Sequence, residues 1–349
     1  MSYSVSDDPH KLEVRVRNLA RHLGLRTPQM SESPAQTIPT FIADKEAEGK
    51  IPRCAYKWQP LSVLKVDAII SQLIILSIMA ENKEIVLITG ANTGIGFEAV
   101  KALFRSSKAY HVLLGSRNPI NGDKAVAQLA EEFPNIKSSV DVVQIDITDD
   151  GAINRLFETV KSKFGRIDVL VNNAGANFES FNHNDGGDPT MAREVFDKAY
   201  SVNVSSTQVF TATFIPLLLA SSSPRMIFLT SGLSTLQGGH ESFLTQVSGS
   251  IPQGWPKPGL PTAVAYRSAK TALNMVMLSW HHLLKGDGVQ VWAISPGFLA
   301  TGLGGNPELL KKAGAGDPAT GGELIRSVIE GEKDGDVGKV VGQSGVQPW

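Results

Sequence analysis

The sequence contains almost no cysteine. Cys54 is the only one among 349 residues, so no disulfide can form within the chain and nothing indicates an oxidising compartment. The seven histidines lack the spacing of a metal site. His281 and His282 adjoin each other in a helical pattern and are interpreted as a partly exposed helix face. We therefore expect no metal and a cytoplasmic location.

Neither sign of charge is in excess. The chain carries 33 Lys and Arg against 34 Asp and Glu, which leaves no overall field to attract nucleic acid or an anionic membrane. The strongly apolar stretch 68–80 has only thirteen residues, whereas a bilayer-spanning helix needs about twenty. We expect no membrane span, with a membrane-anchored enzyme using residues 61–80 as an open alternative. A hydrophobic content of 42% suffices for a sizeable core.

A glycine-rich turn between a strand and a helix is the feature around which the chain is organised. Residues 85–88 are β-favouring aliphatics, and Gly90, Gly94 and Gly96 follow before the helical pattern of residues 97–104. A turn without side chains lets a diphosphate approach the free N–H groups and the positive dipole end of the helix. The stretch predicts a phosphate cradle, although such a turn is weak evidence by itself.

Strand and helix patterns alternate from residue 85 onward. Further strands are predicted over 111–115, 140–145, 169–171, 226–229, 289–294 and 339–341, and helices over 121–133, from Asp149 or Asp150 to Phe164, and over 194–220. This alternation predicts a parallel sheet with right-handed crossovers. We therefore predict one doubly wound, Rossmann-like α/β domain of about seven strands. The polar stretch 238–261 is rich in Gly and Pro and is predicted to form a loop without regular helix.

Short motifs in this domain resemble, in order, those of the short-chain dehydrogenase/reductase family. They are 89–96 (TGANTGIG), 146–148 (DIT), 172–175 (NNAG), Asn203, Ser231, 266–270 (YRSAK), and Pro296 and Gly297 with Thr301. The resemblance covers residues 83–345. Residues 94–98 (GIGFE) and the long insert before Tyr266 are similar to the carbonyl-reductase-like branch. Membership implies a nicotinamide-dependent oxidoreductase acting on CH–OH groups.

The proton chemistry of such an enzyme can be argued from its residue types. Hydride transfer to a carbonyl requires a proton donor at the carbonyl oxygen, and Tyr266 can be that donor. A free phenol has a pKa of about 10, and Lys270, one helical turn later, would place an ammonium beside the phenol oxygen and favour the phenolate. We expect Ser231 to hydrogen-bond the substrate oxygen. The resemblance implies that Asn203 holds a water in the proton relay.

The end of the second predicted strand indicates which dinucleotide binds. In this fold that position meets the adenosine ribose, where a carboxylate selects a free 2′-hydroxyl and a cation accepts the 2′-phosphate of NADPH. Ser116 and Arg117 offer no acid there, and a guanidinium suits a phosphate. NADP(H) is therefore the expected cofactor, although Asn92 and Thr93 stand where a basic residue often supports NADPH. Together with what the family resemblance implies for the adenine and nicotinamide ends, the expected cofactor-binding residues are Gly90, Asn92, Thr93, Gly94, Ile95, Gly96, Ser116, Arg117, Asp146, Ile147, Asn173, Ala174, Gly175, Tyr266, Lys270, Pro296, Gly297, Leu299 and Thr301.

The first eighty residues differ in composition from this domain. Residues 1–60 mix charges, prolines and polar residues, and Asp7, Asp8 and Glu13 are unlike a mitochondrial presequence. The polar lead-in 79–84 is of the kind expected before a first strand. We predict that residues 1–80 are an N-terminal extension, poorly structured or non-native, with a short apolar helix over 68–80. The NAD(P)-binding domain is predicted over 83–345, and a chain that begins at Met79 should fold and act normally.

The function expected from these features is NADPH-dependent reduction of a ketone or aldehyde, or the reverse oxidation of an alcohol. An NAD-linked alcohol dehydrogenase is one alternative. A non-catalytic dinucleotide-binding regulatory protein is another, which the presence of Ser231, Tyr266 and Lys270 disfavours. Aromatic residues in the predicted specificity loops indicate an apolar or aromatic small-molecule substrate: Phe178, Phe181, Phe243, Trp255 and Phe298.

The insert between the serine and the tyrosine bears on assembly. Ser231 and Tyr266 are 35 positions apart, about twenty more than in most of the resembling family. In carbonyl-reductase-like members a comparable insert covers the helix face that other members use to dimerise. A monomer is therefore favoured, with a homodimer as the alternative.

Overall fold

The computed structural model describes residues 83–179, 189–240, 249–251, 253–255, 257 and 263–349. Residues 82–349 form one compact unit. The predicted extension, including its apolar helix, lies outside the described residues, as does much of the insert before Tyr266. The predictions about the extension, about a chain that begins at Met79 and about a monomer therefore stay predictions. Among the described helices, none combines the length and apolar composition that a bilayer crossing requires.

An eight-stranded sheet in the order β3-β2-β1-β4-β5-β6-β7-β8 forms the centre of this unit. All neighbours pair in parallel except β7 and β8, which form an antiparallel hairpin. The strands are β1 (Glu84–Ile88), β2 (Tyr110–Ser116), β3 (Ser139–Gln144), β4 (Val169–Asn172), β5 (Arg225–Leu229), β6 (Gln290–Ser295), β7 (Val340–Gly342) and β8 (Gly345–Gln347). The predicted doubly wound fold is confirmed, and β8 is the strand that the pattern did not indicate.

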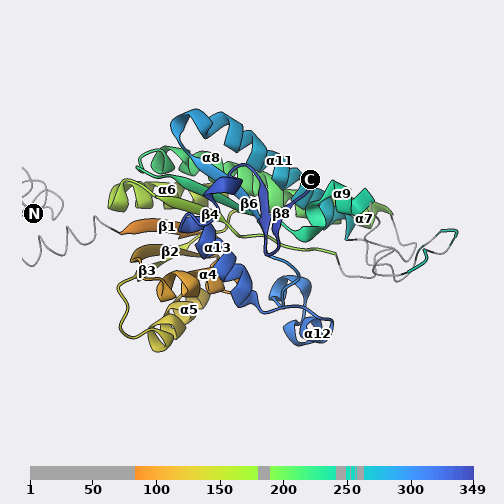
Figure 1. Cartoon of the computed structure of the whole chain (residues 1–349), viewed down its shortest axis with the longest axis horizontal. Helices are drawn as coiled ribbons and strands as arrows, with labels where there is room; N and C mark the ends of the chain where they lie inside the picture. Colours follow the sequence, from red (N-terminus) through yellow and green to blue (C-terminus); the bar gives the residue numbers. More distant parts are fainter. Residues whose placement is uncertain (1–82, 180–188, 241–248, 252, 256, 258–262) are drawn as a thin grey trace, which may run out of the picture. The chain divides into compact units, whose positions relative to one another are not determined.

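Helices cover both faces of the sheet (Figure 1). One face carries α4 (Gly94–Arg105), α5 (Pro119–Glu132) and α13 (Pro318–Ile329), and the other carries α6 (Asp150–Phe164), α8 (Thr207–Leu218) and α11 (Val264–Leu284). Strand residues divide between two apolar layers: Val86 and Ile88 pack toward α4 and α13, whereas Leu87 packs toward α8 and α11. Burial on both faces explains why the central strands β1, β4 and β5 are nearly continuous apolar runs.

Helix α13 supports the helix that follows the glycine turn. A Cβ on Gly322 would lie 2.4 Å from the carbonyl carbon of Glu98, so the two helices cross at a distance that only glycine permits. Leu324, Ile325 and Val328 are buried in the same apolar layer as α4. The start of α4 is therefore held from behind as well as by the sheet.

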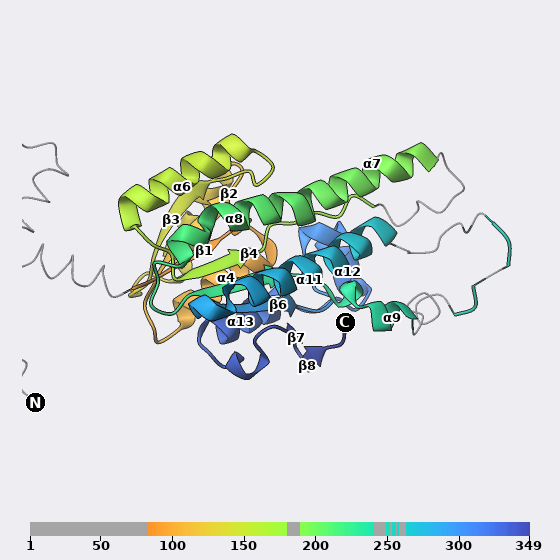
Figure 2. The same ribbon diagram turned by 90° about the horizontal axis from the view of Figure 1, so that it is seen from above.

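Three helices lie beyond the carboxyl ends of the strands, namely α7 (Pro189–Tyr200) and the shorter α9 (Leu236–His240) and α12 (Pro307–Lys312). Figure 2 shows α7 and α8 in one line beside α11. The helix predicted over 194–220 is thus corrected, since it begins at Pro189 and a π-helical turn, η1 (Ser201–Ser206), separates α7 from α8.

Helix α9 is a second correction, because no regular helix was predicted over 238–261. Its single turn includes Gly238, whose N–H donates to the Thr235 hydroxyl at 3.1 Å. This side-chain acceptor at the start of the turn offsets the low helix propensity of glycine.

Candidate active site

The motif residues gather at one edge of the sheet. The phosphate turn follows β1, Arg117 follows β2, Asp146 follows β3, Asn173 follows β4, Ser231 follows β5 and Pro296 follows β6. All six strands are parallel, so their carboxyl ends meet on the same side. Ligands bind at this edge in open α/β sheets.

The glycine turn is held open by an asparagine. Gly90 and Gly94 adopt positive φ angles of 64° and 58°, and the side-chain amide of Asn173 donates to the carbonyls of Thr89 (2.8 Å) and Gly90 (3.0 Å). A Cβ on Gly96 would lie 2.5 Å from that amide nitrogen. Thr93 stands at the N-cap of α4 but makes no side-chain capping bond. The first N–H groups of α4 are therefore available to a phosphate.

The residues after β2 and β3 form the corner where the adenosine end is expected. Ser116 is buried and its hydroxyl donates to the carbonyl of Asn118 at 2.7 Å. The guanidinium of Arg117 is exposed and has no partner within the described part of the chain. Asp146 accepts from the N–H (2.9 Å) and hydroxyl (2.7 Å) of Thr148. An unpaired cation at this corner fits an anionic group on the ribose.

The segment after β4 is tied to the π-helical turn. Asn203 is fully buried; its side-chain oxygen accepts from the N–H of Ala176 (3.0 Å), and its nitrogen donates to the carbonyls of Ala176 (2.8 Å) and Ala199 (2.9 Å). A Cβ on Gly175 would lie 2.8 Å from the oxygen of Asn203 and 3.2 Å from Nζ of Lys270. The arrangement brings Asn203 and Lys270 to either side of Gly175.

Tyr266 and Lys270 lie on consecutive turns of α11, with Nζ of Lys270 5.8 Å from the centre of the Tyr266 ring. The Lys270 ammonium is buried and donates to the carbonyl of Leu229 at 2.8 Å. The side chain of Ser231 lies near the Tyr266 phenol and lowers its pKa. The Ser231 hydroxyl also accepts from the N–H of Leu233 at 3.1 Å. The serine, tyrosine and lysine predicted from sequence therefore come together.

The electrostatics of this group differ from the expectation in one respect. Burial raises the pKa of Tyr266 to about 12, and only the hydrogen bond with Ser231 acts to lower it. Burial lowers the pKa of Lys270 to about 8. The expected lowering of the Tyr266 pKa by the ammonium is not seen, because Lys270, with a pKa of about 8, is already neutral at the pH where the phenol titrates. Tyr266 is thus a protonated phenol at neutral pH, as a proton donor must be.

Comparisons with known proteins agree with these features. The family model described as short chain dehydrogenase matches residues 84–243. The short-chain dehydrogenase/reductase tropE of Talaromyces stipitatus is 46% identical over 270 residues, covering 77% of this chain and 98% of that protein. The short-chain dehydrogenase/reductase eupG of Phoma sp is 42% identical over 277 residues, covering 76% of this chain and 98% of that protein. The chain belongs to the short-chain dehydrogenase/reductase family.

The solved structure of a carbonyl reductase shares the fold. The crystal structure of NADPH bound carbonyl reductase from chicken fatty liver superposes with a TM-score of 0.60 at 23% identity, covering 76% of this chain and 99% of that one. Membership makes the chain an oxidoreductase that uses a nicotinamide dinucleotide, as predicted.

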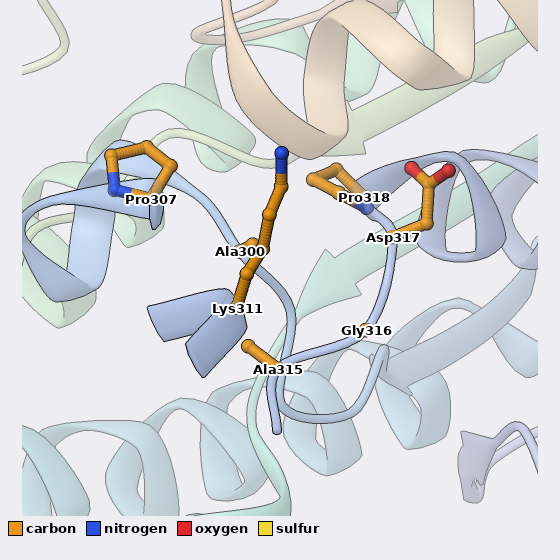
Figure 3. Close-up of a pocket in the computed structure, with 7 residues that line it drawn as sticks. All are labelled: Ala300, Pro307, Lys311, Ala315, Gly316, Asp317 and Pro318. Carbon is orange, nitrogen blue, oxygen red and sulfur yellow. The ribbon is translucent and has the colours of Figure 1, made fainter. Parts of the chain in front are cut away.

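The segment after β6 completes the expected nicotinamide end of this dehydrogenase/reductase site. Leu299 forms a bridge to Gly316, and a Cβ on Gly94 would lie 3.8 Å from Thr301. Next to it is a cavity of about 420 Å³, bordered by Ala300, Pro307, Lys311, Ala315, Gly316, Asp317 and Pro318. Figure 3 shows the Lys311 side chain extending between Pro307 and Pro318. The cavity adjoins the loop through Ala300.

Sequence reasoning did not single out three residues that the structure places at the site. Thr89 accepts through its hydroxyl from the N–H groups of Asn173 (3.1 Å) and Ala174 (3.0 Å), and its place in the glycine motif could have indicated this. Gln347 donates to the Ser231 carbonyl at 3.4 Å. Glu179 accepts from two N–H groups of α11. No sequence spacing indicates the last two contacts.

Proposed function

We propose that this oxidoreductase reduces a ketone or aldehyde with NADPH and that Tyr266 donates the proton. One observation carries the proposal: a buried phenol near Ser231 stands on the helix that also presents a buried lysine. The bound dinucleotide would supply the hydride to the carbonyl carbon. The residues of this chain would supply the proton and stabilise the charge that develops on the carbonyl oxygen.

The proton moves from the phenol to the carbonyl oxygen as that oxygen gains negative charge. A pKa of about 12 keeps Tyr266 protonated before the reaction and still leaves it a stronger acid than an alcohol. Ser231 can donate a hydrogen bond to the same developing oxyanion. Lys270, whose pKa is about 8, is mostly an ammonium at neutral pH and stabilises the phenolate that remains. Asn203 would position the water that returns the proton.

The cofactor would lie along the carboxyl edge of the sheet. The uncapped start of α4 would bind its diphosphate. The adenine would lie against Asp146 and Ile147, and the nicotinamide ribose against Asn173, Ala174 and Gly175. Pro296, Gly297, Leu299 and Thr301 would border the nicotinamide. The exposed guanidinium of Arg117 supports the choice of NADPH, since it has no ion-pair partner to give up within the described residues. The structurally similar chicken carbonyl reductase is described as NADPH bound, which supports the same choice.

Exposed apolar side chains support a substrate of apolar or aromatic character. Phe298 is 57% exposed, Leu303 43% and Leu309 63%, and all three belong to the segment that follows β6. A carbonyl compound with an apolar body would cover part of this surface when it binds.

Two titrations and one screen test the proposal. Purified protein with NADPH is assayed against ketones, quinones and aldehydes by loss of NADPH absorbance, and turnover of an apolar carbonyl is expected.

Fluorescence titration should show tighter binding of NADPH than of NADH. Arg117→Ala should weaken NADPH binding roughly 12- to 160-fold, which is the 1.5–3 kcal/mol of a charge-assisted bond, and Arg117→Glu should reverse the preference. Arg155→Ala is the control, because Arg155 is an exposed arginine on α6 paired with Asp149. Equal affinities for both dinucleotides would defeat the assignment of NADPH.

A further inference from the structure

Helix α11 carries the tyrosine and lysine but lacks a cap of its own. Its N-cap residue, Ala263, has no side-chain acceptor and adopts a left-handed backbone with φ of 43°. It is the only described residue other than glycine with a positive φ. The first N–H groups of a helix have no partner within the helix. In α11 these include the N–H groups of Ala265 and of Tyr266 itself.

Glu179 supplies the missing acceptors from a different part of the chain. One carboxylate oxygen accepts from the N–H of Ala265 at 3.0 Å, and the other accepts from the N–H of Tyr266 at 2.9 Å. A carboxylate at a helix N-terminus is also favoured by the helix dipole. Both carboxylate oxygens therefore accept hydrogen bonds from the first turn of α11, and one of these bonds comes from the backbone of the proposed proton donor, Tyr266.

The loop that presents Glu179 begins at the nicotinamide end of the site. Gly175 precedes Glu179 by four residues, and Ala176 is fastened through both its N–H and its carbonyl to Asn203. The Asn177 side chain then accepts from the N–H of Glu179 at 3.0 Å, which closes a turn that directs the carboxylate toward α11. These hydrogen bonds, with the short chain segment 176–179 between them, thus join Asn203 to the backbone of Tyr266.

We propose that Glu179 is a positioning residue, which fixes the Tyr266 phenol relative to the nicotinamide loop. This inference rests on the proposed reductase function. Without the carboxylate, the first turn of α11 has two N–H groups without acceptors and is free to fray, which displaces the phenol from the carbonyl oxygen. A displacement of about 1 Å of a reacting group can lower a rate about 100-fold. Most residues expected to hold NADPH lie outside the first turn of α11, so its Kd should change little.

The test compares Glu179→Ala and Glu179→Gln with wild type and with Asp149→Ala. Asp149 caps α6 by accepting from the N–H of Ala152 at 3.0 Å, so its loss removes a helix cap away from the tyrosine. The readouts are kcat with NADPH and with NADPD, the Kd of NADPH, and the melting temperature. Glu179→Ala is expected to lower kcat about 10- to 100-fold and to raise the isotope effect on kcat, with Kd changed less than about threefold. Glu179→Gln keeps one acceptor oxygen and should recover part of the rate.

Each outcome decides the inference. If Glu179→Ala lowers only the melting temperature, as Asp149→Ala should, Glu179 is a structural cap and the inference is wrong. A parallel loss of kcat and of NADPH affinity would also overturn it. If Glu179→Ala does not fold, Glu179→Gln is used instead. A lower kcat with a larger isotope effect then supports the inference, and a wild-type kcat overturns it. If wild type reduces no carbonyl compound, the proposed function fails before any variant is compared.

Discussion

The glycine turn offers a prediction whose magnitude follows from the structure. In Gly96→Ala the new Cβ would stand 2.5 Å from the Asn173 amide nitrogen and 2.7 Å from the Gly90 carbonyl oxygen. The amide must leave, and its two hydrogen bonds to Thr89 and Gly90 are lost at about 1 kcal/mol each. Residual crowding against the backbone adds about 1–3 kcal/mol, and the better helix propensity of alanine returns up to about 1 kcal/mol. The free energy of unfolding should fall by about 2–4 kcal/mol.

Urea unfolding and calorimetry measure this change. For a domain of this size the melting temperature should fall by roughly 5 to 15 °C. Affinity for NADPH should fall at least about tenfold, because the displaced amide no longer holds the turn open. Gly286→Ala is the matched control, since a Cβ there meets nothing within 4 Å. Wild-type stability together with wild-type NADPH affinity in Gly96→Ala would show that the amide does not maintain the turn.

Three further predictions follow from the same contacts. The kcat/KM for carbonyl reduction should be constant near neutral pH and fall above about pH 8. Lys270, with a pKa of about 8, loses its proton there, whereas Tyr266 keeps its own. A constant kcat/KM up to about pH 10 would refute this role of the ammonium. Ala263→Gly should raise the free energy of unfolding by about 0.5 kcal/mol, since relief of the left-handed strain exceeds the entropy lost by glycine; urea unfolding checks this, and a less stable variant contradicts it. Gly322→Ala should lower stability by about 1–3 kcal/mol, because its Cβ meets the backbone of α4. Urea unfolding measures this change, and wild-type stability of the variant would contradict the close crossing of α13 and α4.

Features set by local residue order were predictable from sequence. Four aliphatics followed by spaced glycines specify strand, turn and helix, and strands in parallel order bring their following loops to one edge. The gathering of Ser231, Tyr266 and Lys270 at that edge agrees with this order. The start of α6 at Asp150, after the N-cap Asp149, also agrees with the pattern. Periodicity alone could not show the π-helical turn, in which the buried Asn203 side chain donates to the carbonyls of Ala176 and Ala199.

Contacts between distant segments could not be predicted. The i, i+4 spacing of Tyr266 and Lys270 indicated that they are neighbours, but the direction of the lysine is set by the Leu229 carbonyl on another element. The cap on α11 joins residues 86 or 87 positions apart. A single glutamate in a loop has no local pattern that marks such a role. The closing strand β8 is only three residues long, too short for alternation to reveal it.

The central claim is that this chain transfers hydride from NADPH to a carbonyl with Tyr266 as the proton donor. The most direct test is single-turnover reduction by wild type and by Tyr266→Phe, with NADPH affinity measured on the same samples. The variant keeps the ring and its packing and loses only the phenol oxygen. We expect its rate to fall roughly 10²- to 10⁴-fold while the Kd of NADPH stays within about threefold. Reduction by Tyr266→Phe at the wild-type rate would contradict the account.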